Sequence, residues 1–156
     1  MNYPHKNDLE AFLKECEDKL IGENNKKEVK YPKECISPWD SEGINKANEG
    51  LLNELGNSAN VYAIFAAEKN SEQYALKYIG QTRSKLAKTR LTNHLVKKHE
   101  KTGAKLSKVI DHVQSGGKIK ISWISIRPES LRHYIEEELI KNHSESSWNN
   151  HARKKA

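Results

Sequence analysis

The sequence predicts an α+β protein in which a small antiparallel sheet is flanked by helices. Two short apolar segments, residues 61–66 and 74–80, have the composition of β-strands, and the polar residues 68–72 between them predict a hairpin. A third strand is predicted over residues 119–123, where apolar and polar residues alternate. The length of 156 residues suits one compact domain.

Helical spacing of apolar residues predicts three more elements in the same part of the chain. These helices are expected over residues 85–100, 104–115 and 128–142, with Pro128 in the first turn of the last one. The predicted order of elements in this part is therefore β-β-α-α-β-α.

The N-terminal part is predicted to be a two-helix extension of that core. The first helix is expected over residues 8–20, where Asn7 and Glu10 have the spacing of a capping box. Residues 21–37 are polar and rich in lysine, which predicts an irregular connection. A second helix is expected from residue 41 or 42 to residue 55.

Charge is distributed unevenly along the chain, whose net charge is +6. Residues 1–57 contain 8 Lys and Arg against 12 Asp and Glu, a balance of −4, whereas residues 58–156 contain 19 against 9, a balance of +10. We predict a helical accessory extension over residues 1–57, a principal domain over residues 58–152 and a basic tail over residues 153–156. The basic part is expected to meet a polyanion, and a solvated lysine-rich surface is the alternative.

Several classes of protein are not expected. The sequence contains no run of about 20 apolar residues, as a membrane span requires, and its first residues lack the apolar segment of a signal peptide. Cys16 and Cys35 have neither metal-ligand spacing nor the density of a disulfide scaffold. We therefore expect a cytoplasmic protein without a membrane partner.

The predicted last helix carries an acidic residue on its apolar face. On a helical projection Glu136 falls inside the apolar arc, whereas Glu137 and Glu138 fall outside it. A carboxylate on the core side of a helix is costly unless it is paired or binds a metal. Glu136 is therefore a candidate metal ligand, and an ion pair with Arg132 one turn earlier is the alternative.

The helix predicted over residues 85–100 shows the same pattern with basic residues. Arg90 and His94 fall within its apolar arc, one turn apart. An arginine and a histidine so placed are suited to bind a phosphate oxygen and to transfer a proton. The alternative is an arginine and a histidine with structural roles at the edge of the core.

Two tyrosines in the predicted hairpin complete the candidate set. Tyr62 shares a strand face with Ile64, and Tyr78 is expected to share a face with Leu76. In an antiparallel pair the two tyrosines can point to the same side of the sheet. Aromatic residues are also common in strands for packing alone.

Together these residues form an ordered set of motifs that resembles the GIY-YIG nuclease superfamily. The set spans about residues 58–152 and follows the order of elements in that family. Its members are Asn60-Val61-Tyr62, Tyr78-Ile79-Gly80, Arg90, His94, Glu136, Leu139-Ile140 and Trp148-Asn149. The chain departs from the family pattern at Asn60 and Val61, in a longer hairpin, and in lacking a proline before Trp148.

The resemblance implies a metal-dependent endonuclease that hydrolyses DNA phosphodiester bonds with one divalent ion. Mg²⁺ is expected, with Mn²⁺ as the other candidate, bound by Glu136. Arg90 would stabilise charge on the phosphate, and Tyr62 is favoured as the base with Tyr78 and His94 assisting. Asn149 would orient the site.

Partners follow from the same interpretation. DNA is the expected partner and RNA stays open, as do a homodimer through the N-terminal helices or the core and a protein inhibitor. Lysines near the predicted site are expected to contact phosphates, which makes binding sensitive to salt. They are Lys77, Lys85, Lys97, Lys98, Lys101, Lys105 and Lys108.

Three other functions compete with this interpretation. The main one is a non-catalytic nucleic-acid-binding module with the same fold. The second is a nuclease of the histidine–metal type that uses His94, His99 and His112. The third is a structural subunit that binds a larger complex through its acidic N-terminal helices.

Overall fold

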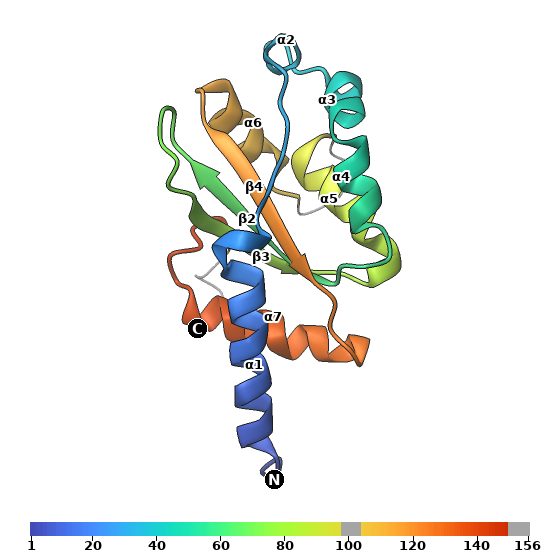
Figure 1. Ribbon diagram of the computed structural model, residues 1–156, viewed down its shortest axis with the longest axis vertical. Helices are drawn as coiled ribbons and strands as arrows, with labels where there is room; N and C mark the ends of the chain where they lie inside the picture. Colours follow the sequence, from blue (N-terminus) through green and yellow to red (C-terminus); the bar gives the residue numbers. More distant parts are fainter. Residues whose placement is uncertain (98–103, 150–156) are drawn as a thin grey trace.

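The computed structural model describes residues 1–97 and 104–149 and has an α+β architecture, as predicted (Figure 1). Four antiparallel strands form one sheet in the order β1-β4-β2-β3. The strands are β1 (Lys27–Glu28), β2 (Val61–Ala67), β3 (Ala75–Gln81) and β4 (Lys118–Ile124). The α-helices are α1 (Lys6–Ile21), α2 (Lys33–Ile36), α3 (Ser41–Ala47), α4 (Glu49–Leu55), α5 (Ala87–Leu95), α6 (Leu106–Gln114) and α7 (Arg132–Asn142).

The three predicted strands are confirmed, but the sheet has a fourth strand that was not predicted. β1 lies within residues 21–37, which were expected to be irregular, and it pairs with Lys120 and Ile121 of β4. Two residues are too few to show an alternating pattern. The pairing arises because the chain passes along the edge of β4 between α1 and α2.

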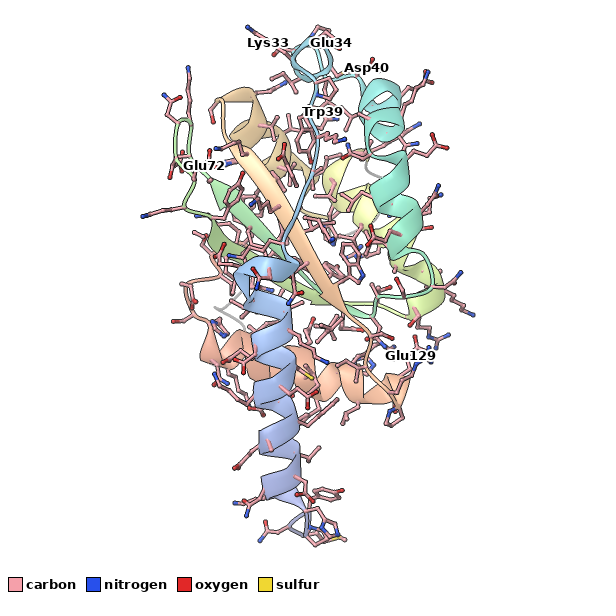
Figure 2. All side chains as sticks on the ribbon, viewed as in Figure 1. Lys33, Glu34, Trp39, Asp40, Glu72 and Glu129 are labelled. Carbon is pink, nitrogen blue, oxygen red and sulfur yellow. The ribbon has the colours of Figure 1, made fainter. Side chains whose placement is uncertain are left out.

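The N-terminal part contains four helices where two were predicted. Asn48 interrupts the expected second helix and separates α3 from α4. The predicted capping box of the first helix is wrong: α1 begins after His5, and no side chain caps it. A side-chain cap is found at α3, where Asp40 accepts a hydrogen bond from the Gly43 N–H at 3.1 Å (Figure 2).

Helices cover both faces of the sheet, so each face has its own apolar core (Figure 1). α1 and α7 pack on one face, where Leu20 and Leu139 meet Phe65 of β2. Residues of α2 to α6 pack on the other face, where Leu52 and Leu91 join the core around Ile64. Every residue of β2 is buried because this strand is covered on both sides.

Residues 1–57 contribute to both cores. Cys16 of α1 is buried with Phe65 on one face, and Ile44 and Leu55 are buried with Ile64 on the other. The acidic part of the chain therefore packs directly against the sheet of the predicted principal domain.

None of the described helices is both long and apolar enough to cross a membrane.

Three buried or half-buried asparagines join distant parts of the chain by the same contact. Each side chain accepts a hydrogen bond from the N–H of one residue and donates to the C=O of that residue, at 2.7 to 2.9 Å. The pairs are Asn48 with Lys30, Asn60 with Ile126, and Asn149 with Ile79. Each amide thus replaces one unit of strand pairing where no strand is available.

We predict that Asn60→Ala lowers the free energy of unfolding by about 2–4 kcal/mol, because the N–H and C=O of Ile126 lose their partners inside the protein. Urea unfolding measures this change. Asn45→Ala, at an exposed position of α3, is the matched control and is expected to change it by less than about 0.5 kcal/mol. Equal effects of the two substitutions would contradict the role of the Asn60 amide.

Candidate functional site

Tyr62 and Tyr78 lie on the same face of the sheet, on adjacent strands. In the register of β2 and β3, Tyr62 pairs with Gly80 and Ile64 pairs with Tyr78. The centroids of the two tyrosine rings are 6.2 Å apart. The structure therefore brings together the two tyrosines singled out in the sequence.

A β-bulge in the hairpin places the side chains of β3 on different faces from those predicted. The register of the hairpin shifts between Ile64 and Phe65, so Leu76 pairs with Phe65 and belongs to the core on the opposite face from Tyr78. The expectation that Leu76 and Tyr78 share a face was wrong, because the bulge inserts Lys77 as an extra residue.

Gly80 leaves the space that the Tyr62 ring occupies. A Cβ atom at position 80 would lie 2.5 Å from both Cζ and Oη of Tyr62. Since Tyr62 is only 1% exposed, its ring has no room to move away. The glycine of the Tyr78-Ile79-Gly80 motif is thus required by the packing of the first tyrosine against the second strand.

His94 of α5 is completely buried behind the tyrosines. Its Nε2 lies 2.8 Å from the Tyr62 hydroxyl, and its Nδ1 accepts a hydrogen bond from the Lys105 main-chain N–H at 3.0 Å. Burial lowers the pKa of His94 to about 3, and the charges of Arg90 and Lys105 act in the same direction. The imidazole is therefore neutral, and it contacts the Tyr62 hydroxyl from inside the core.

The charges of Arg90 and Glu136 have opposite effects on the pKa values of the two tyrosines. Burial raises the pKa of both Tyr62 and Tyr78; Arg90 lowers it by charge and hydrogen bonding, and the charge of Glu136 raises it. Arg90 comes from α5 and Glu136 from α7, so charged groups of helices from both sides of the sheet act on these tyrosines. The guanidinium of Arg132 donates to Gln81 Oε1 at 2.8 Å and to the Glu129 carbonyl at 3.1 Å.

Asn149 fixes the outer edge of β3 beside Tyr78. Its amide pairs with the N–H and C=O of Ile79, each at 2.9 Å, and the Trp148 N–H donates to the Lys77 carbonyl at 2.8 Å. Since β3 is an edge strand, these contacts occupy main-chain groups that would otherwise face solvent. Asn149 therefore holds the backbone of β3 next to Tyr78.

A histidine between two carboxylates holds the segment that carries Asn149. His143 Nε2 lies 3.0 Å from Glu17 of α1, and its Nδ1 lies 2.9 Å from Glu145. Burial lowers the pKa of His143, but the hydrogen bonds of the two carboxylates outweigh burial and raise the pKa above its usual value. A residue of the N-terminal helix thus supports the position of the C-terminal segment.

The predicted phosphate-binding lysines differ in their exposure to solvent. Lys85, Lys97 and Lys108 are exposed, whereas Lys77 and Lys105 are half-buried. The Lys105 ammonium lies 5.6 Å from the centroid of the Tyr78 ring. Lys98 and Lys101 lie outside the described residues.

Glu136 is the candidate ligand for a metal ion. Within residues 1–97 and 104–149, no group of three or more His, Cys, Asp and Glu side chains is arranged to hold a metal. Glu136 is a half-buried carboxylate whose charge acts on both Tyr62 and Tyr78. A carboxylate oxygen is the kind of ligand that Mg²⁺ takes, and this ion keeps several waters and binds substrate phosphates.

Two of the histidines proposed for the competing metal site lie in the described part of the chain, and each has a hydrogen-bond partner. Both ring nitrogens of His94 have protein partners, and His112 Nε2 lies 2.8 Å from the Ala67 carbonyl. His99, the third member of that predicted set, lies outside the described residues. His94 therefore has no ring nitrogen left for a metal ion in the described structure.

Sequence reasoning missed the contact between the Lys105 main chain and His94. Lys105 was singled out for its side chain, and no residue pattern signals the direction of a main-chain N–H.

No protein-family model, no curated protein and no solved structure matches this chain. The geometry and the sequence resemblance therefore carry the functional argument.

We predict that His94 makes the protein less stable in acid. In the folded protein the pKa is about 3, against an ordinary value of 6.5, so below pH 6.5 the unfolded chain binds a proton that the folded protein excludes. Between pH 7.5 and 5 this group removes about 2 kcal/mol from the free energy of unfolding. Urea unfolding at both pH values measures the loss.

Two histidine variants test this prediction, one at the buried position and one at a surface position. His94→Gln, at the buried position, is expected to be less stable at pH 7.5, but on acidification its free energy of unfolding is expected to fall by about 2 kcal/mol less than that of the natural protein. His133→Gln, at an exposed position of α7, is expected to retain the pH dependence of the natural protein. An unchanged pH dependence in His94→Gln would contradict the excluded proton.

We predict that Gly80→Ala and Gly50→Ala have opposite effects on stability. The methyl group at position 80 meets the Tyr62 ring, which is expected to cost about 1–3 kcal/mol. At position 50, in α4, the new methyl group meets no described atom within 4 Å apart from its chain neighbours and the nearby backbone of its own helix, and removal of a helical glycine is expected to stabilise by about 0.5–1 kcal/mol. Thermal unfolding compares the two variants, and a stable Gly80→Ala protein would contradict the close packing.

Proposed function

We propose that this protein is a metal-dependent endonuclease that hydrolyses phosphodiester bonds of DNA. The observation that carries the proposal is the convergence of five side chains from four elements at one place. β2 and β3 supply Tyr62 and Tyr78, α5 supplies Arg90 and His94, and α7 supplies Glu136. These five residues belong to the set of motifs on which the chain resembles the GIY-YIG superfamily.

The charges of the site suit attack of water on a phosphodiester. Arg90 is placed to bind a phosphate oxygen and to stabilise the charge that develops on it. The same guanidinium lowers the pKa of both tyrosines and so favours a phenolate, which accepts a proton from the attacking water. The new P–O bond to water forms as the bond to the leaving oxygen breaks.

Glu136 is the residue proposed to hold the divalent ion. Bound Mg²⁺ would supply a positive charge for a phosphate oxygen and for the leaving oxygen. The charge of Glu136 raises the pKa of both tyrosines, which supports assigning this carboxylate to the same site.

His94 and Asn149 are proposed to position the tyrosines. His94 is completely buried and contacts Tyr62, so it acts behind the reacting groups. Asn149 acts on the other tyrosine through the main chain of Ile79. Exposed lysines around the site, among them Lys85 and Lys108, are proposed to contact the phosphates on either side of the bond that is cut.

We predict that the protein cuts plasmid DNA with Mg²⁺ and that Glu136→Gln and Arg90→Ala each reduce the rate by at least about 100-fold. Gel analysis of supercoiled plasmid measures the rate and separates nicked from linear products. Glu137→Gln removes an adjacent, exposed carboxylate of α7 and is the matched control, expected to cut at the natural rate.

Two outcomes of this experiment are informative against the proposal. Equal cutting by all variants would contradict the site assignment. Absence of cutting on any DNA or RNA, together with retained binding, would favour a non-catalytic nucleic-acid-binding module of the same fold.

A further inference from the structure

The hydrogen bonds of His94 define where its ring proton lies. A main-chain N–H can only donate, so Nδ1, which accepts from the Lys105 N–H at 3.0 Å, carries no proton. In a neutral imidazole the other nitrogen then carries the proton. Nε2 therefore donates to the Tyr62 hydroxyl, 2.8 Å away.

This donation leaves the Tyr62 hydroxyl proton for a different partner. Arg90 is the other charged group beside this hydroxyl on α5, and a guanidinium has donors only. Tyr78 lies on the same sheet face, with its ring centroid 6.2 Å from that of Tyr62 and 5.2 Å from that of His94. Tyr78 can accept the proton, and it is half-buried where Tyr62 is only 1% exposed.

We propose that Lys105 is a positioning residue of this site: its main-chain N–H selects the Nε2–H tautomer of His94, so that hydrogen bonds run outward from His94 to Tyr62 and from Tyr62 to Tyr78. The start of α6 holds this N–H in place, because the Lys105 carbonyl accepts hydrogen bonds from Lys108 N and Val109 N at 3.1 Å each.

The direction of the hydrogen bonds assigns different roles to the two tyrosines. Tyr62 stabilises a phenolate at Tyr78 by donating to it, and Tyr78 is the more exposed of the two. Tyr78 is therefore the tyrosine that meets the attacking water, and Tyr62 positions it. The sequence had favoured Tyr62 as the base. This assignment of roles rests on the proposed function, whereas the tautomer does not.

The tautomer is tested by long-range ¹H–¹⁵N spectra of the histidine side chains in the full-length protein. The natural protein is expected to show the Nε2–H form of His94. His112 is an internal reference, since its Nε2 faces the Ala67 carbonyl and must carry a proton. An Nδ1–H form of His94 in the natural protein overturns the proposal without any variant.

Two substitutions at one position isolate the main-chain N–H. Lys105→Ala and Lys105→Pro both remove the ammonium group, but only proline removes the N–H. Lys105→Ala is expected to retain the Nε2–H form of His94, and Lys105→Pro is expected to shift His94 toward the Nδ1–H form while His112 is unchanged. The same His94 spectrum in both variants overturns the proposal.

Cleavage rates of the same two variants test the consequence for the reaction. Lys105→Pro is expected to have a kcat at least about tenfold below that of Lys105→Ala, with KM within about twofold. Equal kcat values, with cleavage otherwise intact, overturn the positioning role in the reaction. If no form of the protein cuts nucleic acid, the proposed function fails, and the spectra still decide the role of Lys105 in selecting the tautomer.

Discussion

The hydrogen bond between Tyr62 and His94 is the contact on which the arrangement of the site depends. It joins the central strand β2 to α5 inside a core that excludes water, where an unpaired hydroxyl or imidazole would be costly. Gly80 leaves room for the Tyr62 ring, and Lys105 supplies the donor that the second nitrogen of His94 needs. Two further segments of the chain are thus adapted to one buried polar pair.

The sheet provides a rigid base for this pair because both of its faces are covered. Helices α1 and α7 pack on one face and α2 to α6 on the other, so the strand that carries Tyr62 is buried along its whole length. Asparagine side chains replace strand pairing where the sheet ends, at Ile126 beyond β4 and at Ile79 on the edge of β3. The second of these holds the backbone between Tyr78 and Gly80, so the end of the chain helps to define the site.

In the site, burial shifts the pKa values of the tyrosines and the charge of Arg90 opposes that shift. Burial raises the pKa of both tyrosines and lowers that of His94, so all three are kept neutral in the protein at neutral pH. Arg90 works against burial at the tyrosines, and Glu136 works with it. A positive charge that engaged Glu136, such as a divalent ion, would weaken the effect of this carboxylate and make ionisation of a tyrosine easier.

The sequence by itself determined the order of the main elements and the side chains that face inward. Apolar periodicity placed Glu136 inside the apolar arc and Arg90 and His94 on one helix face, because a helix repeats every 3.6 residues whatever it packs against. In the structure Glu137 is exposed, as this pattern predicts, but Glu138 is half-buried like Glu136. Contacts between distant segments were decided by tertiary structure alone. β1 exists because the chain passes along β4. The helix expected to end at residue 55 is interrupted at Asn48, whose amide binds the main chain of Lys30. A bulge at Lys77 turns Leu76 away from the face of Tyr78. The Lys105 N–H that selects the His94 tautomer belongs to the main chain, which is the same in almost every residue, so only the folded structure reveals its direction.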